Sequence, residues 1–355
     1  MDSRSLASSL KTRANIYHTR KIVQEHTDKV ARDWDGLEIQ IADEAKKNAK
    51  LAASLSEYLQ SELENNYKII ALYKLTAKSK KSFLDLYSSV NSKVRKDYPT
   101  VLEGTKLAAL SQLLTVASCS QTADFTRIVL TRRRTFTLRQ KIDKKKLGNV
   151  AEKALTVYDD VFGVADYHWQ TFDVISLNHV TGVLEFRADY TRAANSYQNA
   201  KQIDLSLAEA LGWVVFNCAQ MKKPFDSSGA INLFPAIAHF AFNDDGHISK
   251  LHFMTPQGSI KQDTMKKGED LRNEVFHKKG LEAVGGMITP FDISVIWHVT
   301  NRFGPGQEIE LTIPSSLSAA SMGNSANQTY AILRYCSTPD DTKLLVDKLL
   351  EATKP

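Results

Sequence analysis

The stretch TRIVLTRRRTFTLRQKIDKKKLG, residues 126–148, lies between a helix-rich first part of the chain and a strand-rich remainder. Its first half is rich in Ile, Val, Thr and Phe, residues that favour an extended strand over a helix. Read with a period of two, Ile128 and Leu130 share one face of that strand with Phe136 and Leu138. The stretch therefore predicts a strand-like arm rather than a continuation of the preceding helices.

The same stretch is strongly basic, because it contains nine Lys and Arg residues and a single acidic residue, Asp143. Clustered cations gain free energy by releasing the counterions of a phosphate backbone, so we expect this arm to bind DNA or RNA. Two other interpretations stay open: a solvated basic face that pairs with acidic residues elsewhere, and a nuclear-import signal. The expected nucleic-acid-binding residues of the arm are Arg127, Arg132, Arg133, Arg134, Arg139, Lys141, Lys144, Lys145 and Lys146.

Before this arm the sequence has helical character. Residues 5–97 contain no proline and one glycine, and Leu55, Leu59, Leu63 and Tyr67 recur at intervals of four. We expect a helical bundle or oligomerisation region over 1–125, with a break at Pro99 and a further helix over 101–117.

A second basic cluster lies within this helical region. Lys74, Lys78 and Lys81 are spaced to occupy one face of a helix, and Lys93, Arg95 and Lys96 follow closely in the sequence. We expect the first three to contact phosphate groups together with the arm.

After the arm, which we bound at 126–165 with a connecting helix through Leu155, Tyr158 and Phe162, the sequence alternates between strands and turns. Hairpins are predicted for 170–190, for 232–253 around Asn243–Gly246, and for 291–313 around Gly304–Gly306. A buried helix is predicted for 205–221, and a C-terminal helix has Thr338 as its N-cap. The fold class is α+β: an N-terminal helical region, then a mainly antiparallel domain over 166–355.

Charge divides unevenly between these parts. Residues 1–150 have 28 basic and 16 acidic side chains, a formal charge of +12, and residues 151–355 have 18 and 24, a charge of −6. A basic and an acidic half favour head-to-tail association, so we expect a homo-oligomer as well as a polyanion partner.

The sequence also bounds the compartment and the cofactors. Three widely spaced cysteines predict no disulfide framework, and no apolar run approaches the ~20 residues that span a bilayer. We expect an intracellular protein, cytoplasmic or nuclear, without a membrane span. No nucleotide-binding glycine motif and no metal-ligand histidine spacing occurs, so we expect no cofactor and no metal site.

One string suggests an enzyme instead. EDLRNEVFHKKG, residues 269–280, contains Arg272-Asn273-x-x-x-His277, which resembles the RNxxxH motif of HEPN-type ribonucleases. The resemblance implies a metal-independent RNA cleavage at a dimer of helical bundles, with His277 as general base and Arg272 stabilising the phosphorane charge. The alternative to a catalytic site is a short surface helix.

Taken together, the residues favour a non-enzymatic, self-associating protein that binds nucleic acid through its basic arm. The alternatives are a HEPN-like ribonuclease that uses Arg272 and His277, and a purely structural helical scaffold.

Overall fold

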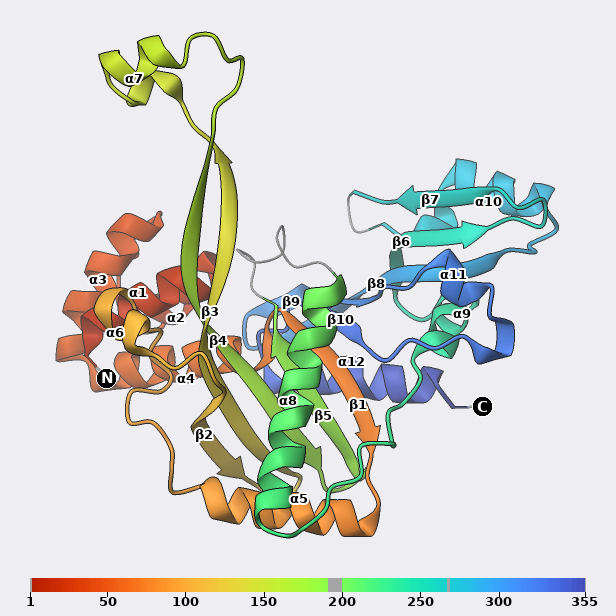
Figure 1. Ribbon diagram of the computed structural model, residues 1–355, viewed down its shortest axis with the longest axis horizontal. Helices are drawn as coiled ribbons and strands as arrows, with labels where there is room; N and C mark the ends of the chain where they lie inside the picture. Colours follow the sequence, from red (N-terminus) through yellow and green to blue (C-terminus); the bar gives the residue numbers. More distant parts are fainter. Residues whose placement is uncertain (1, 191–199, 267–268, 355) are drawn as a thin grey trace.

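The computed structural model describes residues 2–190, 200–266 and 269–354, and the protein has an α+β fold (Figure 1). The strands of its described part form one ten-stranded sheet, and every neighbouring pair in it is antiparallel. In their order across the sheet, the strands are β2 (Thr115–Gln121), β3 (Phe125–Lys141), β4 (Phe162–Asn178), β5 (Val183–Asp189), β1 (Lys68–Lys74), β10 (Ala331–Arg334), β9 (Gly304–Ile313), β8 (Thr289–Asn301), β6 (His247–Met254) and β7 (Ile260–Thr264).

Helices cover both faces of this sheet. One face is covered at the β2–β4 end by α1 (Ser3–Arg13), α2 (Ile16–Gln24), α3 (Trp34–Lys47) and α4 (Ala49–Asn65), and further along by α9 (Phe234–Phe242) and α12 (Pro339–Ala352). The opposite face is covered by α5 (Ala77–Val90) and α8 (Ala200–Gln220). The short helices are α6 (Gly104–Ala109), α7 (Asn149–Ala154), α10 (Val275–Ala283), α11 (Leu317–Ala320), η1 (Lys144–Lys146), η2 (Leu271–Asn273) and η3 (Gly323–Ser325).

Strands β3 and β4 are paired from Phe125 with Asn178 to Lys141 with Phe162. Their other neighbours end earlier, because β2 pairs with β3 only as far as Thr131 and β5 pairs with β4 only over 174–177. Beyond this point the two strands form an isolated ribbon that projects from the body and ends in η1 and α7 (Figure 1). Residues 135–168 are called the arm below.

Several sequence predictions are confirmed. The strand over 127–138 is β3, the hairpins over 170–190 and 291–313 are β4–β5 and β8–β9, and the buried helix is α8. Helix α12 begins with Thr338 as N-cap and has a complete capping box with Asp341.

Other predictions were wrong. Residues 68–74 form β1 instead of a helix. The strand is buried on both faces, so its sequence is an unbroken apolar run without the alternation that identifies a strand. Tyr67 therefore lies outside α4, whose buried stripe ends with Leu63. In the 101–117 segment only α6 is helical, and β2 follows it.

Two further segments differ from expectation. Residues 234–242 form α9 rather than a hairpin strand, with Pro235 in its first turn, where a missing N–H costs nothing. The helix expected through Phe162 ends at Ala154, and Phe162 begins β4. Because β1 lies between β5 and β10, the sheet joins the first part of the chain to the last.

Candidate nucleic-acid interface

One row of side chains on α8 borders two hollows on the sheet face that this helix covers. The row consists of Leu205, Glu209, Trp213 and Asn217, spaced by four residues along the helix. Leu205 and Glu209 line an upper hollow of about 340 Å³ at the base of the arm. Trp213 and Asn217 line a lower hollow of about 630 Å³.

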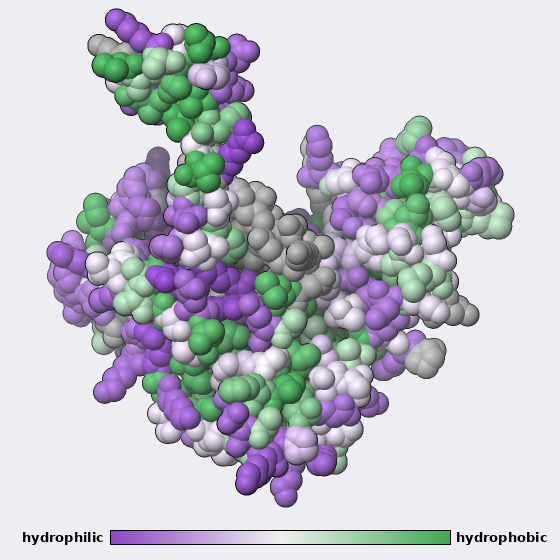
Figure 2. Space-filling model, viewed as in Figure 1, coloured by the Kyte–Doolittle hydropathy of each residue, from purple (hydrophilic) through white to green (hydrophobic). Residues whose placement is uncertain are grey.

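The two hollows lie next to the same segment after α6, since Ser111 lines the lower one and its neighbour Gln112 the upper one. We call the two hollows together the α8 groove. Figure 2 shows hydrophilic residues gathered in a band across the base of the arm, beside α8. Among the side chains that the structure describes, six cations and two carboxylates line the groove: Lys93, Arg95, Lys106, Arg132, Arg133, Arg134, Asp97 and Glu209.

The arginines of the upper hollow are built into the fold. Alternation along β3 directs Arg132 and Arg134 to the α8 side, where Arg132 is 7% exposed and forms an ion pair with Glu209. Arg134 lies 3.8 Å from Asp173 and 3.9 Å from Glu209, distances too long for hydrogen bonds. Burial lowers the pKa of the Arg134 guanidinium, and the two carboxylates oppose this shift.

These arginines also retain unused donors. Among the described residues, no hydrogen-bond partner is found for four buried guanidinium nitrogens: Arg132 Nε, Arg133 Nε, Arg134 Nε and Arg134 Nη2. Buried N–H groups are normally satisfied, so four unpartnered ones at the base of the arm call for an explanation, such as a bound water or anion. Phosphate and carboxylate oxygens are the acceptors that guanidinium groups bind most strongly.

The lower hollow differs in that its cations are more accessible. Lys93 and Lys106 are exposed, and no carboxylate partner is found for either in the described part of the chain. Arg95 forms an ion pair of 2.6 Å with Asp97. The half-buried ring of Trp213 lies among them, so cations and an aromatic surface occur in one hollow.

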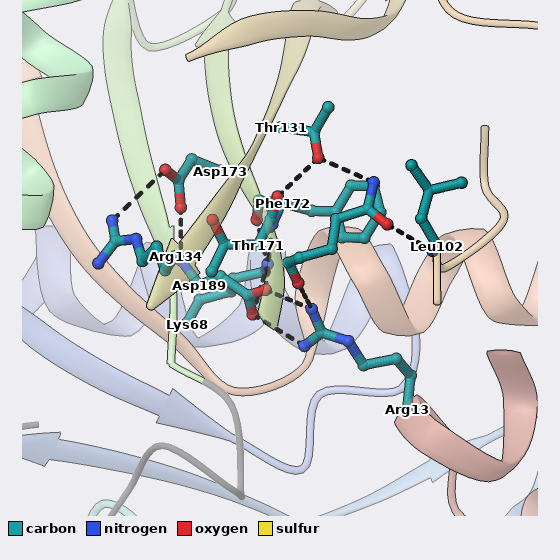
Figure 3. Close-up of polar contacts among 10 residues, drawn as sticks. Arg13, Lys68, Leu102, Thr131, Arg134, Thr171, Phe172, Asp173 and Asp189 are labelled. Atoms are coloured by element: carbon teal, nitrogen blue, oxygen red, sulfur yellow. Dashed lines mark hydrogen bonds and ion pairs between the residues drawn. The ribbon is translucent and has the colours of Figure 1, made fainter. Parts of the chain in front are cut away.

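Arg134 belongs to a buried network beneath the groove, drawn in Figure 3. Asp173 accepts a hydrogen bond of 2.8 Å from the backbone N–H of Asp189, whose carboxylate pairs at 2.8 Å with Arg13 and at 3.4 Å with Lys68. Burial alone would raise the pKa of Asp189, but the charges of Arg13 and Lys68 hold it below its ordinary value. This network fixes the base of the arm against α1 and β1.

Not all of the predicted nucleic-acid-binding cations of residues 126–148 face solvent. Arg127 is buried, paired with Glu64 and packed on the Phe125 ring, and Arg132 and Arg134 are covered as described. Their carboxylate partners come from α4, β4 and α8, elements far away in the sequence. Arg133 is half-buried and donates to the carbonyl of Ala108.

Further along the arm, three cations make contacts within the arm itself. Arg139 stacks on Phe162 with 4.3 Å from the guanidinium carbon to the ring centre, and Lys141 pairs with Asp160 at 2.5 Å. Lys144 donates to the carbonyl of Tyr158, whereas Lys146 is exposed. The side chain of Lys145 lies outside the described part of the structure.

The second basic cluster is split between two elements. Lys74 ends β1, so its expected place on a helix face is wrong, while Lys78 and Lys81 are exposed on α5. Lys93 and Arg95, which follow them in the sequence, line the α8 groove instead. Sequence reasoning missed Lys106 and Trp213, because neither belongs to a basic run.

Arg272 and His277 do not share one helix. Arg272 lies in η2, where it binds Asp270 at 2.7 Å and donates to the carbonyls of Asn243 and Gly246. His277 lies in α10, is 4% exposed and contacts the Asp263 carboxylate at 2.6 Å. We call β6, β7, η2 and α10 the β6–β7 lobe. Both side chains bind groups within or beside this lobe, and this arrangement favours a structural role over catalysis.

No protein-family model and no curated protein sequence matches this chain. Across residues 2–190, 200–266 and 269–354, no helix has the length and apolar character needed to cross a bilayer. Within the same ranges, no group of three or more His, Cys, Asp or Glu side chains is placed to hold a metal ion.

Proposed function

We propose that this protein binds single-stranded nucleic acid along the α8 groove. The observation that carries the proposal is the series of cationic side chains that line the groove, of which Lys93 and Lys106 are exposed and Arg133 is half-buried. Phosphate oxygens would accept hydrogen bonds from Arg133, and Lys93 and Lys106 would contact phosphates further along the strand.

The aromatic side chains of the groove favour a single strand over a duplex. Leu205 and Asn217 are twelve residues apart on α8, which corresponds to roughly 18 Å at the rise of an α-helix. Phe136 lies in the upper hollow and Trp213 in the lower one, so each can stack on an unpaired base. Contacts to the backbone and to base faces do not depend on the sequence, so we expect the groove itself to bind DNA or RNA without sequence preference.

A variant that removes three accessible cations tests the groove. Lys93→Ala, Lys106→Ala and Arg133→Ala together should weaken binding to a fluorescent poly-dT or poly-U oligonucleotide. Three lost phosphate contacts should reduce the slope of log K against log salt concentration by about 2. The matched control changes Lys261, Lys266 and Lys278 to Ala, three exposed cations of the β6–β7 lobe. Equal affinities and slopes for the two variants would remove the proposal.

We also propose that the arm mediates self-association with a second copy of this chain. The arm exposes large apolar side chains that would normally be covered: Val150 is 86%, Val157 81% and Val164 70% exposed. The charges of +12 and −6 on the two halves of the sequence favour a partner with this same charge distribution.

Changing Val150, Val157 and Val164 to Ser should lower the sedimentation-equilibrium mass, with the melting temperature unchanged. An apolar contact should persist at high salt, whereas a purely electrostatic one should weaken. A mass that is equal for the wild type and the variant, at every concentration, would contradict arm-mediated association.

A reducing, intracellular location is part of the same proposal. The cysteines Cys119, Cys218 and Cys336 are free thiols, and the last two are buried. Burial raises the pKa of Cys119 and of Cys218 to about 11, so both stay in the unreactive thiol form.

A further inference from the structure

A second polar hollow, of about 540 Å³, lies on the opposite face of the sheet from the α8 groove. It is bordered by α1, the end of α4, β4, the β8–β9 turn and the segment after β10. Four of its lining residues are aromatic: Trp34, Tyr67, Trp169 and Tyr335. We call it the Tyr67 pocket.

Two of these aromatic residues have an unusual backbone. Tyr67 has a φ of +50° and Tyr335 a φ of +65°, in the left-handed region that side chains other than glycine rarely adopt. Their rings lie 5.6 Å apart and nearly perpendicular. Asn66 helps to hold this arrangement, since its side-chain oxygen accepts a hydrogen bond of 2.9 Å from the Tyr335 backbone N–H. Strained residues that are held in this way are concentrated at binding sites.

The pocket also contains polar groups with unused hydrogen-bonding capacity. Glu62 is 3% exposed, and its Oε2 accepts a hydrogen bond of 2.7 Å from Asn66. Among the described residues its Oε1 makes no close hydrogen bond, although the hydroxyl groups of Ser337 and Tyr58 interact with the carboxyl group, and the Nε1–H of Trp169 has no partner. One acceptor and one donor with unused capacity thus lie buried in side chains that line the pocket beside aromatic rings.

Burial raises the pKa of Glu62 to about 7, an effect that the nearby hydroxyl groups of Ser337 and Tyr58 and the amide of Asn66 partly offset. A bound donor would favour the ionised form, because it would satisfy Oε1.

We propose that the Tyr67 pocket binds one nucleobase that carries an exocyclic amino group. The aromatic side chains supply a stacking surface, the amino group donates to Glu62 Oε1, and a ring nitrogen or carbonyl accepts from Trp169 Nε1. Adenine, cytosine and guanine have such a group, whereas uracil does not.

This inference rests on the proposed function, since the base would belong to a strand held by the same protein. The buried network in Figure 3 joins the two sites: Arg134 lines the α8 groove and Arg13 lines the Tyr67 pocket. Mononucleotides test the pocket separately, because they are too short to fill the groove.

The experiment is a calorimetric titration of the full chain with AMP, CMP, GMP and UMP at pH 8. We expect the three amino-bearing nucleotides to bind at least about tenfold more tightly than UMP, within the range set by one good base contact. Ribose 5-phosphate serves as a probe of binding through the sugar and phosphate alone. Equal affinity for it, or no binding of any nucleotide at 10 mM, would overturn the proposal.

Glu62→Gln identifies the acceptor. Asn66 donates to Oε2, so the new side chain should turn its oxygen to Asn66 and its NH₂ group to the position of Oε1. Amino-bearing nucleotides should then bind no better than UMP. Glu57→Gln, an exposed change on the same helix, is the matched control and should bind like the wild type.

Trp169→Phe keeps the ring but removes the donor, and it provides a second test if Glu62→Gln fails to fold. Undiminished binding of AMP, CMP and GMP by a folded variant at either position would exclude this site. If mononucleotides bind but the groove variant leaves oligonucleotide binding intact, the proposed groove fails and the pocket stands. The reverse pattern would retain the groove and remove the pocket.

Discussion

Strand β3 passes through two environments that place the same kind of side chain very differently. In its inner half, within the sheet, Arg127 and Arg132 are buried and paired with carboxylates from α4 and α8. In its outer half, within the arm, Arg139 and Lys141 are exposed, and Lys141 pairs with a neighbouring acid of the same arm. Whether an arginine meets solvent is therefore decided by the elements that surround the strand, not by the basic run itself.

The energetic consequences of the two environments differ as well. Buried charges lose hydration and need good partners, so removing one partner is costly. Exposed pairs gain little, since water and salt screen them. Substitutions in the inner region should thus affect the free energy of unfolding, while those in the arm should act mainly on binding and association.

The largest effect is expected at the centre of the buried network. Asp189→Ala removes the carboxylate shared by Arg13 and Lys68, which lie 2.8 and 3.4 Å from it. Two buried cations are then left uncompensated, so the variant should lose about 3–5 kcal/mol of unfolding free energy in urea denaturation. Asp160→Ala, which removes the exposed partner of Lys141, is the control and should cost at most about 0.5 kcal/mol. Similar losses for the two variants would contradict the contrast.

The second effect concerns Glu62, a buried carboxyl group that lacks the cationic partners of Asp189. Its pKa is raised by burial from 4.5 to about 7, so the folded protein binds a proton more tightly than the unfolded chain. The contribution of Glu62 to stability is therefore greatest below pH 4.5 and falls as the pH rises to 7. The full difference is on the order of 3 kcal/mol.

Urea denaturation at pH 5 and pH 8 measures this effect. Relative to the wild type, Glu62→Gln should be the more stable at pH 8 and should show a smaller decrease between the two pH values. Glu57→Gln leaves the buried group in place and should follow the wild-type pH dependence. If Glu62→Gln also followed it, the carboxyl group would not be the group that titrates.

Much of the fold follows from local sequence patterns. Strands such as β6 and helices such as α12 can be predicted from the sequence, because one face is buried and the other is exposed to solvent, which gives the apolar residues a regular period. Strand β1 and helix α9 were assigned wrongly for one reason: their segments are short and almost wholly apolar. Periodicity then gives no information, and only the tertiary neighbours decide between helix and strand.

The candidate sites were harder to predict. The sequence indicated a basic surface and included Lys93 and Arg95 in a basic cluster, but the groove also needs Trp213 from a helix over 100 residues away. Glu62 and Tyr335, which meet in the Tyr67 pocket, have no local signature either. Polar groups without partners become visible only when the whole chain is folded around them.

The smallest expected effect is on the unfolding free energy when an arginine is removed from each half of β3. Arg132→Ala should cost about 1–3 kcal/mol, because it leaves a cavity beside α8 and removes the partner of Glu209. Arg139→Ala removes a side chain that stacks on Phe162 at the surface of the arm, and should change the unfolding free energy by less than about 0.5 kcal/mol. Thermal and urea unfolding of both variants at one pH measures the difference. A large loss for Arg139→Ala would mean that the arm packs against the body in solution, contrary to the isolated ribbon described above.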